Sequence, residues 1–231
     1  MKAKMGEREM CIETYMAGLQ PPAGHQWSEY DKSLFEISAT EPDDNGKVDH
    51  CLEDRGAGKV KAIWFDQVMS HWTDLENKRK NHLPATCRID AYYVSDTGRF
   101  LIEFKKDGSL NRHKDKLWLK FHDSLTQLID HGWVSLTQAC DSLLYIVVRT
   151  GLARYDKSSF TEQNFKKLPE TIKLAIINGY TYGMQDLMLR PWEFPVSAEC
   201  GLGCFEGVSC NRVLTLTVAQ FDRYCQDNHW I

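Results

Sequence analysis

The stretch RIDAYYVSDTGRFLIEFKK, residues 88–106, decides the fold that this sequence predicts. Two short segments of alternating residues flank SDTG, whose composition is typical of a turn, so the stretch predicts a β-hairpin. Ionisable residues interrupt both strands where a half-buried sheet favours apolar side chains. Asp90 interrupts the first strand, and Glu103 and Lys105 interrupt the second.

Alternation along the second strand assigns its side chains to two faces. Residues two apart on a strand point to the same side of the sheet, so Glu103 and Lys105 share one face. The opposite face is expected to be apolar, since it carries Phe100, Ile102 and Phe104.

The position of Asp90 depends on how the two strands pair. If Val94 lies opposite Phe100 across a short loop, Asp90 lies opposite Phe104. A shift by one residue, or a bulge, brings one of the charged residues of the second strand directly opposite Asp90. The sequence therefore permits the two carboxylates to meet, and it leaves the register open by one residue.

A carboxylate on a buried sheet face is costly unless it is paired with a cation or bound to a metal. Glu103 and Lys105 can form a plain ion pair on one face of a surface hairpin, and this is the simpler interpretation. Two converging carboxylates also make a hard-oxygen site suited to Mg²⁺, which keeps several waters and accepts phosphate oxygens. A neighbouring ammonium can then position a metal-bound water or stabilise charge on a phosphate.

The spacing of these residues resembles a known nuclease motif. Asp90, twelve further residues and then Glu103-Phe104-Lys105, on a hairpin between two expected helices, resemble the core of the PD-(D/E)xK nuclease superfamily. The resemblance extends from residue 58 to residue 148, and Ile89 stands where the family often has proline before the aspartate. It implies an α/β fold with a restriction-endonuclease-like α-β-β-β-α-β core. It also implies hydrolysis of DNA or RNA phosphodiesters with Mg²⁺ or Mn²⁺.

The same resemblance implies roles for particular residues. Asp90 and Glu103 would bind the metal, and Lys105 would assist the attacking water, which makes these three the predicted catalytic residues. The superfamily often adds an acidic residue from the preceding helix. Glu76, fourteen residues before Asp90, is the candidate for this third metal ligand, ahead of Asp74 and Asp66.

Basic residues follow the hairpin and suggest a nucleic-acid surface. The segment from Lys105 to Lys120 carries a local net charge of +4, whereas the whole chain has a net charge of -4. A local basic surface beside an acidic metal site can hold a phosphate backbone, and DNA is expected ahead of RNA. The competing interpretation is the solvated face of a helix. The predicted nucleic-acid-binding residues are Lys106, Arg112, Lys114, Lys116 and Lys120.

Hydrophobic periodicity predicts the elements around the hairpin. Helices are expected over 58–80 and about 114–131, and the apolar run at 142–148 predicts a strand buried on both faces. Outside this core, 33–39 is expected to be a short strand, 168–180 a helix, and 212–226 a strand that runs into a helix.

Length and composition favour a single globular domain. The 231 residues are 42% hydrophobic, enough to bury a core. We expect an N-terminal elaboration over 1–57, the nuclease-like core over 58–150 and a C-terminal elaboration over 151–231. No apolar run of transmembrane length and no apolar secretory core is visible, so a cytoplasmic protein without a membrane partner is expected. An oligomer is compatible with these features.

Eight cysteines raise the question of a metal centre. Cys200, Cys204 and Cys210 resemble the cysteine trio that holds an iron–sulfur cluster in some nucleases of this superfamily. The first gap here is three residues rather than two, so ordinary reduced thiols are favoured over an iron–sulfur cluster or zinc. The upstream partner of such a cluster would be Cys11, Cys51 or Cys87.

The sequence thus predicts a metal-dependent nuclease, with phage defence, a mobile element or a toxin as possible settings. The alternative is a catalytically inactive protein of the same fold that binds a protein or a nucleic acid. The negative net charge and the flanks that the motif does not cover leave room for it.

Overall fold

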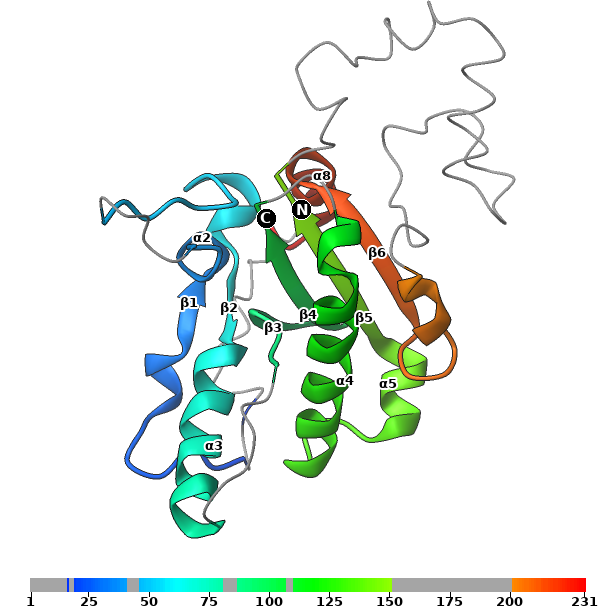
Figure 1. The fold of residues 1–231 in the computed structure, drawn as a ribbon. Helices are drawn as coiled ribbons and strands as arrows, with labels where there is room; N and C mark the ends of the chain where they lie inside the picture. Colours follow the sequence, from blue (N-terminus) through cyan, green and yellow to red (C-terminus); the bar gives the residue numbers. More distant parts are fainter. Residues whose placement is uncertain (1–15, 17–18, 41–45, 81–86, 107–109, 151–200) are drawn as a thin grey trace, which may run out of the picture.

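The computed structural model describes residues 16, 19–40, 46–80, 87–106, 110–150 and 201–231, with the side chains of 74–80 and 111–112 excepted. These residues form a mixed α/β fold around a six-stranded sheet, with strand order β1-β2-β3-β4-β5-β6 (Figure 1). Neighbours are antiparallel from β1 to β4 and parallel from β4 to β6. The strands are β1 (Asp31–Ser33), β2 (Lys61–Trp64), β3 (Ala91–Ser95), β4 (Gly98–Lys105), β5 (Leu143–Arg149) and β6 (Arg212–Thr217).

Helices cover both faces of this sheet. The α-helices are α2 (Leu34–Ile37), α3 (Phe65–Lys80), α4 (Lys114–Asp130), α5 (Leu136–Ser142) and α8 (Val218–Asp227). Single turns of 3₁₀-helix are η1 (Trp27–Glu29), η2 (Gly56–Lys59), η3 (Leu110–His113) and η5 (Leu202–Phe205). Figure 1 shows α4 in front of the sheet and α8 behind the upper ends of its strands.

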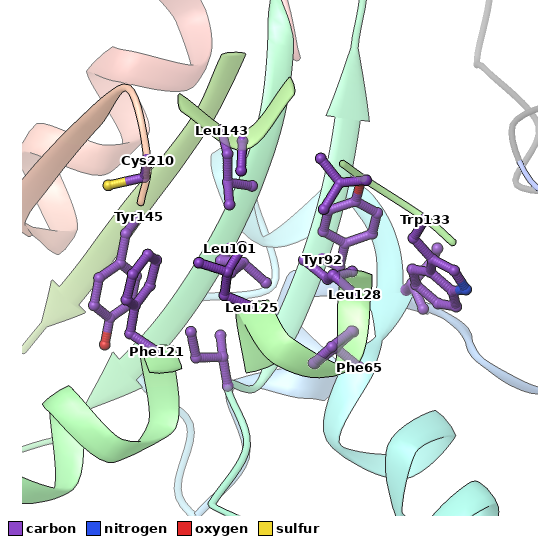
Figure 2. Close-up of a cluster of buried hydrophobic side chains, with 14 of the residues drawn as sticks. Phe65, Tyr92, Leu101, Phe121, Leu125, Leu128, Trp133, Leu143, Tyr145 and Cys210 are labelled. Carbon is purple, nitrogen blue, oxygen red and sulfur yellow. The ribbon is translucent and has the colours of Figure 1, made fainter. Parts of the chain in front are cut away.

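Two apolar cores correspond to these two faces. One core joins the sheet to α3 and α4, and Figure 2 shows how Phe65, Phe121 and Leu128 meet Leu101 and Tyr145 there. The other core packs α2 and α8 on the opposite face and includes Phe100, Ile102 and Phe104. The predicted apolar face of the second hairpin strand is therefore confirmed. The charged face of β4 is turned toward α4.

The hairpin forms where the sequence predicts it, but its register differs by one residue. Ser95 pairs with Gly98 across a two-residue turn, so Tyr93 lies opposite Phe100. The alternative that places Val94 opposite Phe100 is wrong. Continuing the observed pairing by one step beyond Ala91 puts Asp90 opposite Glu103 rather than Phe104, which is what brings the two carboxylates to one place.

Helix α4 and strand β5 also agree with the elements that the sequence predicts. Leu117, Phe121, Leu125 and Leu128 are buried along α4, as their helical spacing predicts. β5 is buried along nearly its whole length, as expected for a strand covered on both faces. A short helix, α5, precedes β5 and was not expected; Ser135 begins it by accepting a hydrogen bond from the backbone amide of Gln138.

Two predicted elements are wrong. Residues 58–80 are not one helix: the chain forms η2, then β2, and becomes helical only at Phe65. β2 is held by pairing with β1 and β3, contacts between distant residues that local periodicity does not encode. The strand expected over 33–39 is wrong beyond Ser33, which ends β1, because Ser33 and Glu36 form a reciprocal capping box that begins the short helix α2.

The strand and helix expected over 212–226 are confirmed as β6 and α8. The helix expected over 168–180 lies outside the described residues. No helix in the part of the chain that the structure describes is long and apolar enough to cross a membrane.

Candidate functional site

The candidate site lies where β3 begins, at the open end of the hairpin. Asp90 immediately precedes β3, and two backbone amides fix it. Its backbone oxygen accepts a hydrogen bond from the amide of Phe65 at 3.0 Å, and its Oδ2 accepts one from the amide of Phe104 at 2.7 Å. The first bond ties Asp90 to the start of α3, and the second ties its carboxylate to β4.

Glu103 lies beside Asp90 and is fully buried. Two ammonium groups satisfy its carboxylate. Lys105, on the same face of β4, forms an ion pair with Oε1. Lys120, from α4, places its Nζ 2.8 Å from Oε1 and 2.9 Å from Oε2.

Lys120 also contacts the second carboxylate, since its Nζ lies 3.2 Å from Oδ1 of Asp90. The four side chains Asp90, Glu103, Lys105 and Lys120 therefore form one group, which we call the carboxylate–ammonium cluster. Its formal charge is zero, with an ammonium positioned between the two carboxylates. The predicted convergence of Asp90, Glu103 and Lys105 is present in this geometry.

Burial governs the electrostatics of the cluster. Burial, and then the neighbouring Asp90 carboxylate, raise the pKa of Glu103 to about 7, and the ammoniums of Lys120 and Lys105 act against this shift. For Lys120, burial works to lower the pKa, but the carboxylates of Glu103 and Asp90 outweigh burial and raise it. Lys120 is therefore a stable cation in this setting.

Asp66 is an acidic residue that lies near the cluster without belonging to it. It lies in the first turn of α3, and the guanidinium of Arg88 approaches its carboxylate at 3.6 Å. Burial raises the pKa of Asp66, Arg88 and Lys120 oppose that rise, and Asp90 adds to it. Asp66 is thus within electrostatic reach of both Asp90 and Lys120.

The third predicted metal ligand, Glu76, lies on the same helix but much further along it. Helix α3 begins at Phe65, whose amide bonds to Asp90, and the helical rise puts position 76 roughly 16 Å along the axis from that end. The side chain of Glu76 lies outside the described set. Among the described side chains of α3, Asp66 is the acidic one near the cluster, although the sequence favours Glu76 over it.

The predicted nucleic-acid-binding residues have different environments. Lys114 and Lys116 are exposed at the start of α4, with Lys114 above the ring of Trp118. Lys106 is exposed and paired with Asp49. Arg112 lies in η3, and its side chain is outside the described set.

Lys120 is the exception among these basic residues. It was predicted as a nucleic-acid contact, but its side chain is only 22% exposed and belongs to the carboxylate–ammonium cluster. A signal for this was present in the sequence. Lys120 follows Leu117 by three residues and precedes Ser124 by four, and both are buried, so it borders the apolar stripe of α4.

The described residues contain no group of three or more His, Cys, Asp or Glu side chains arranged to hold a metal ion. The cluster supplies two carboxylates, which are hard oxygen donors. Mg²⁺ commonly binds through only one or two protein carboxylates and fills its remaining positions with water and phosphate oxygens. The donor set of Asp90 and Glu103 therefore fits Mg²⁺ or Mn²⁺ in chemistry, although the ammonium of Lys120 now bridges the two donors.

Cys204 and Cys210, the described members of the C-terminal trio, belong to no metal-holding group among the described residues. Cys204 is exposed and Cys210 is buried, with its thiol directed at the backbone oxygen of Phe205, while Cys200 lies outside the described residues. Of the upstream candidates, Cys51 is buried, Cys87 is half-buried and Cys11 lies outside the described residues. Neither an iron–sulfur cluster nor zinc gains support from this arrangement.

Comparisons with protein-family models, with curated proteins and with solved structures found no match. The mixed α/β fold and the geometry of the cluster are therefore the features of the molecule that bear on its function.

Proposed function

We propose that this protein is a metal-dependent nuclease of the PD-(D/E)xK type. The observation that carries the proposal is the meeting of Asp90 and Glu103 at the end of a hairpin, with two ammoniums in contact with them. A fully buried carboxylate beside a half-buried one has a cost that a purely structural role does not require. A metal site that works on phosphates gives the arrangement a purpose.

The order of elements agrees with this proposal in part. Helix α3, strands β3 and β4, helix α4 and strand β5 follow one another, with β4 parallel to β5 and the short α5 inserted before it. The restriction-endonuclease-like core has three strands between its two helices. Here the third antiparallel strand, β2, pairs with β3 but precedes α3 in the chain.

In this proposal Asp90 and Glu103 would hold one divalent cation, which would supply Lewis-acid activation of the phosphate and of water. The protein's own groups orient the substrate. Lys105 is held on the same face as Glu103, where its ammonium can stabilise charge on the phosphate or position the attacking water. Exposed Lys114 and Lys116 supply cations for the nucleic-acid backbone, and DNA is the proposed substrate.

A cleavage assay tests the proposal. Supercoiled plasmid, single-stranded DNA and single-stranded RNA are incubated with the protein in Mg²⁺, Mn²⁺ or EDTA. We expect cleavage of DNA that requires the metal and falls by about 100-fold or more in Glu103→Gln and in Lys105→Ala, because each removes a group placed at the reacting phosphate. Lys59→Gln, which removes an ammonium paired with Asp54 outside the cluster, is the matched control. Cleavage that persists in both cluster variants would contradict the site assignment.

One observation favours a second candidate function, a non-enzymatic protein of this fold that binds nucleic acid. Lys120 and Lys105 together already neutralise the two carboxylates, so the cluster has no net formal charge without a metal. On this reading the protein binds DNA through the exposed lysines of α4, with no cleavage and no stabilisation by Mn²⁺. Fluorescence anisotropy with labelled DNA in EDTA, together with thermal unfolding in Mn²⁺, distinguishes the two candidates.

A further inference from the structure

The position of Lys120 has a consequence for how a metal can enter the cluster. Its Nζ lies within hydrogen-bond distance of one oxygen of Asp90 and both oxygens of Glu103. A cation that joined these two carboxylates would need the same oxygens. Lys120 and a divalent cation are therefore alternative partners of one pair of carboxylates.

The charge of the cluster makes the competition stronger. Two carboxylates and two ammoniums sum to zero, and the site is largely closed to water, with Glu103 fully buried. A divalent cation added beside both ammoniums would leave an excess of two positive charges in a medium that screens charge poorly. Departure of one ammonium removes half of that excess and frees the carboxylate oxygens.

Lys120 is the ammonium better placed to leave. Lys105 belongs to β4 within the sheet, whereas Lys120 reaches the cluster from α4, a helix that packs against the sheet. One turn earlier on α4 lies exposed Lys116, four residues before Lys120 and so on the same side of the helix. A phosphate that binds near Lys116 would offer the Lys120 ammonium a new anionic partner close to its present one.

We propose that Lys120 is a resident cation that exchanges the carboxylates for a substrate phosphate, so that divalent metal and nucleic-acid backbone bind cooperatively. The inference rests on the proposed metal site between Asp90 and Glu103. In the absence of substrate, Lys120 holds the two carboxylates and weakens metal binding. With a phosphodiester present, Lys120 binds the phosphate, and the carboxylates become available to the metal.

Titration calorimetry of the full chain with Mn²⁺ tests this, with and without a short phosphorothioate-linked DNA oligonucleotide that resists cleavage. We expect the oligonucleotide to tighten Mn²⁺ binding to the wild type by about tenfold, equivalent to about 1.4 kcal/mol of coupling. In Lys120→Gln, Mn²⁺ alone should bind about tenfold more tightly than to the wild type, and the oligonucleotide should add little. Lys120→Arg keeps a cation there and should restore weak binding and the coupling.

Lys59→Gln serves as the control, since it removes an exposed ammonium that pairs with Asp54 away from the cluster, and its Mn²⁺ affinity should equal that of the wild type. Mn²⁺ affinity that is unchanged or lower in Lys120→Gln overturns the inference. Equal Mn²⁺ affinity of the wild type with and without the oligonucleotide also overturns it, and this measurement does not depend on a variant's folding. Circular dichroism checks the fold of each variant.

The outcome is separable from that of the proposed function. Coupled binding without any DNA cleavage would uphold the exchange by Lys120 and contradict the nuclease. Metal-dependent cleavage with uncoupled binding would uphold the nuclease and contradict the exchange.

Discussion

Glu103 is the residue on which the site depends most, because it is fully buried and contacts both ammoniums of the cluster. Its neighbour Asp90 is fixed by backbone amides from two elements, so the distance between the carboxylates is set by the fold rather than by side-chain freedom. Single substitutions at Glu103 should therefore report directly on the electrostatics of the site.

The raised pKa of Glu103, about 7 against an ordinary value of 4.5, predicts a pH dependence of stability. Between these values the folded protein holds a proton that the unfolded chain has released. The contribution of Glu103 to the free energy of unfolding is therefore fully present below pH 4.5. It is lost as the pH rises to about 7, with a slope of up to about 1.4 kcal/mol per pH unit.

Urea unfolding of the wild type and of Glu103→Gln from pH 4.5 to pH 8, in EDTA, measures this contribution. We expect the free energy of unfolding of the wild type, relative to the variant, to fall as the pH rises and then to level off above pH 7. A difference that stays constant or increases across this range would refute the assignment.

The cysteine thiols provide a second test at the residue scale. Cys204 is exposed, whereas burial raises the pKa of Cys51 to about 11 and that of Cys210 to about 12. Since the thiolate is the reactive form, iodoacetamide at pH 8 should label Cys204 well before the other two. Peptide mapping by mass spectrometry measures the order, and labelling in urea, where all three should react alike, is the control.

At the scale of elements, helix starts are set by local capping, and α8 gives the clearest case. Thr217 accepts a hydrogen bond from the backbone amide of Gln220, whose side chain bonds back to the amide of Thr217. Thr217→Ala should lower the free energy of unfolding by about 1 kcal/mol, because the part-buried backbone amide of Gln220 loses its acceptor. Thr126→Ala, on the exposed face of α4, should change it by less than about 0.5 kcal/mol. Urea unfolding measures both, and equal effects would argue against the cap.

The elements that could be predicted from sequence are those whose pattern is local. The apolar stripe of α4, the buried run of β5 and the alternation of the hairpin all carry their own periodicity. β2 does not: four residues are too few to show a period, and their strand conformation depends on partners in β1 and β3. The residues before Phe65 were therefore assigned to the helix that follows them.

The part of the site that lies on the hairpin could be predicted from the sequence, and the part that comes from the helices could not be predicted fully. Asp90, Glu103 and Lys105 follow from spacing along a hairpin. Lys120 is indicated only as a neighbour of the apolar stripe of α4, and Asp66 only as one of three acidic residues on α3. Which helical residue lies near Asp90 and Glu103 depends on how each helix packs on the sheet. Lysine side chains are usually exposed, so residue type alone would not predict the partial burial of Lys120.

On the scale of the whole molecule, segments far apart in sequence lie in one sheet, and a hydrogen bond joins the C-terminal helix to a turn near the N-terminus. The Asp222 carboxylate on α8 accepts a hydrogen bond from the amide of buried Ala57, at a distance of 2.8 Å, and the two residues are 165 positions apart. This contact attaches the C-terminal helix to η2, the turn that leads into β2.

We expect Asp222→Ala to destabilise the protein by about 1–3 kcal/mol, since it leaves the amide of Ala57 without an acceptor. Asp222→Asn retains a side-chain oxygen and should recover more than half of that loss. Urea unfolding compares the three proteins. If the Ala and Asn variants are equally destabilised, the hydrogen bond contributes little and the carboxylate acts by its charge.

The two-residue turn of the hairpin restricts how the gene can change in length. Extra residues at positions 96–97 can be taken up in a longer loop while every pair from Ser95 and Gly98 onward stays in place. Loss of Asp96 leaves too few residues to close the loop, so the strands must slide by one residue, and Asp90 would face Ile102 or Phe104 instead of Glu103. Natural variants of this chain are therefore expected to contain insertions in this loop, and a single deletion there should be selected against even though the loop lies at the far end of the hairpin from the carboxylates.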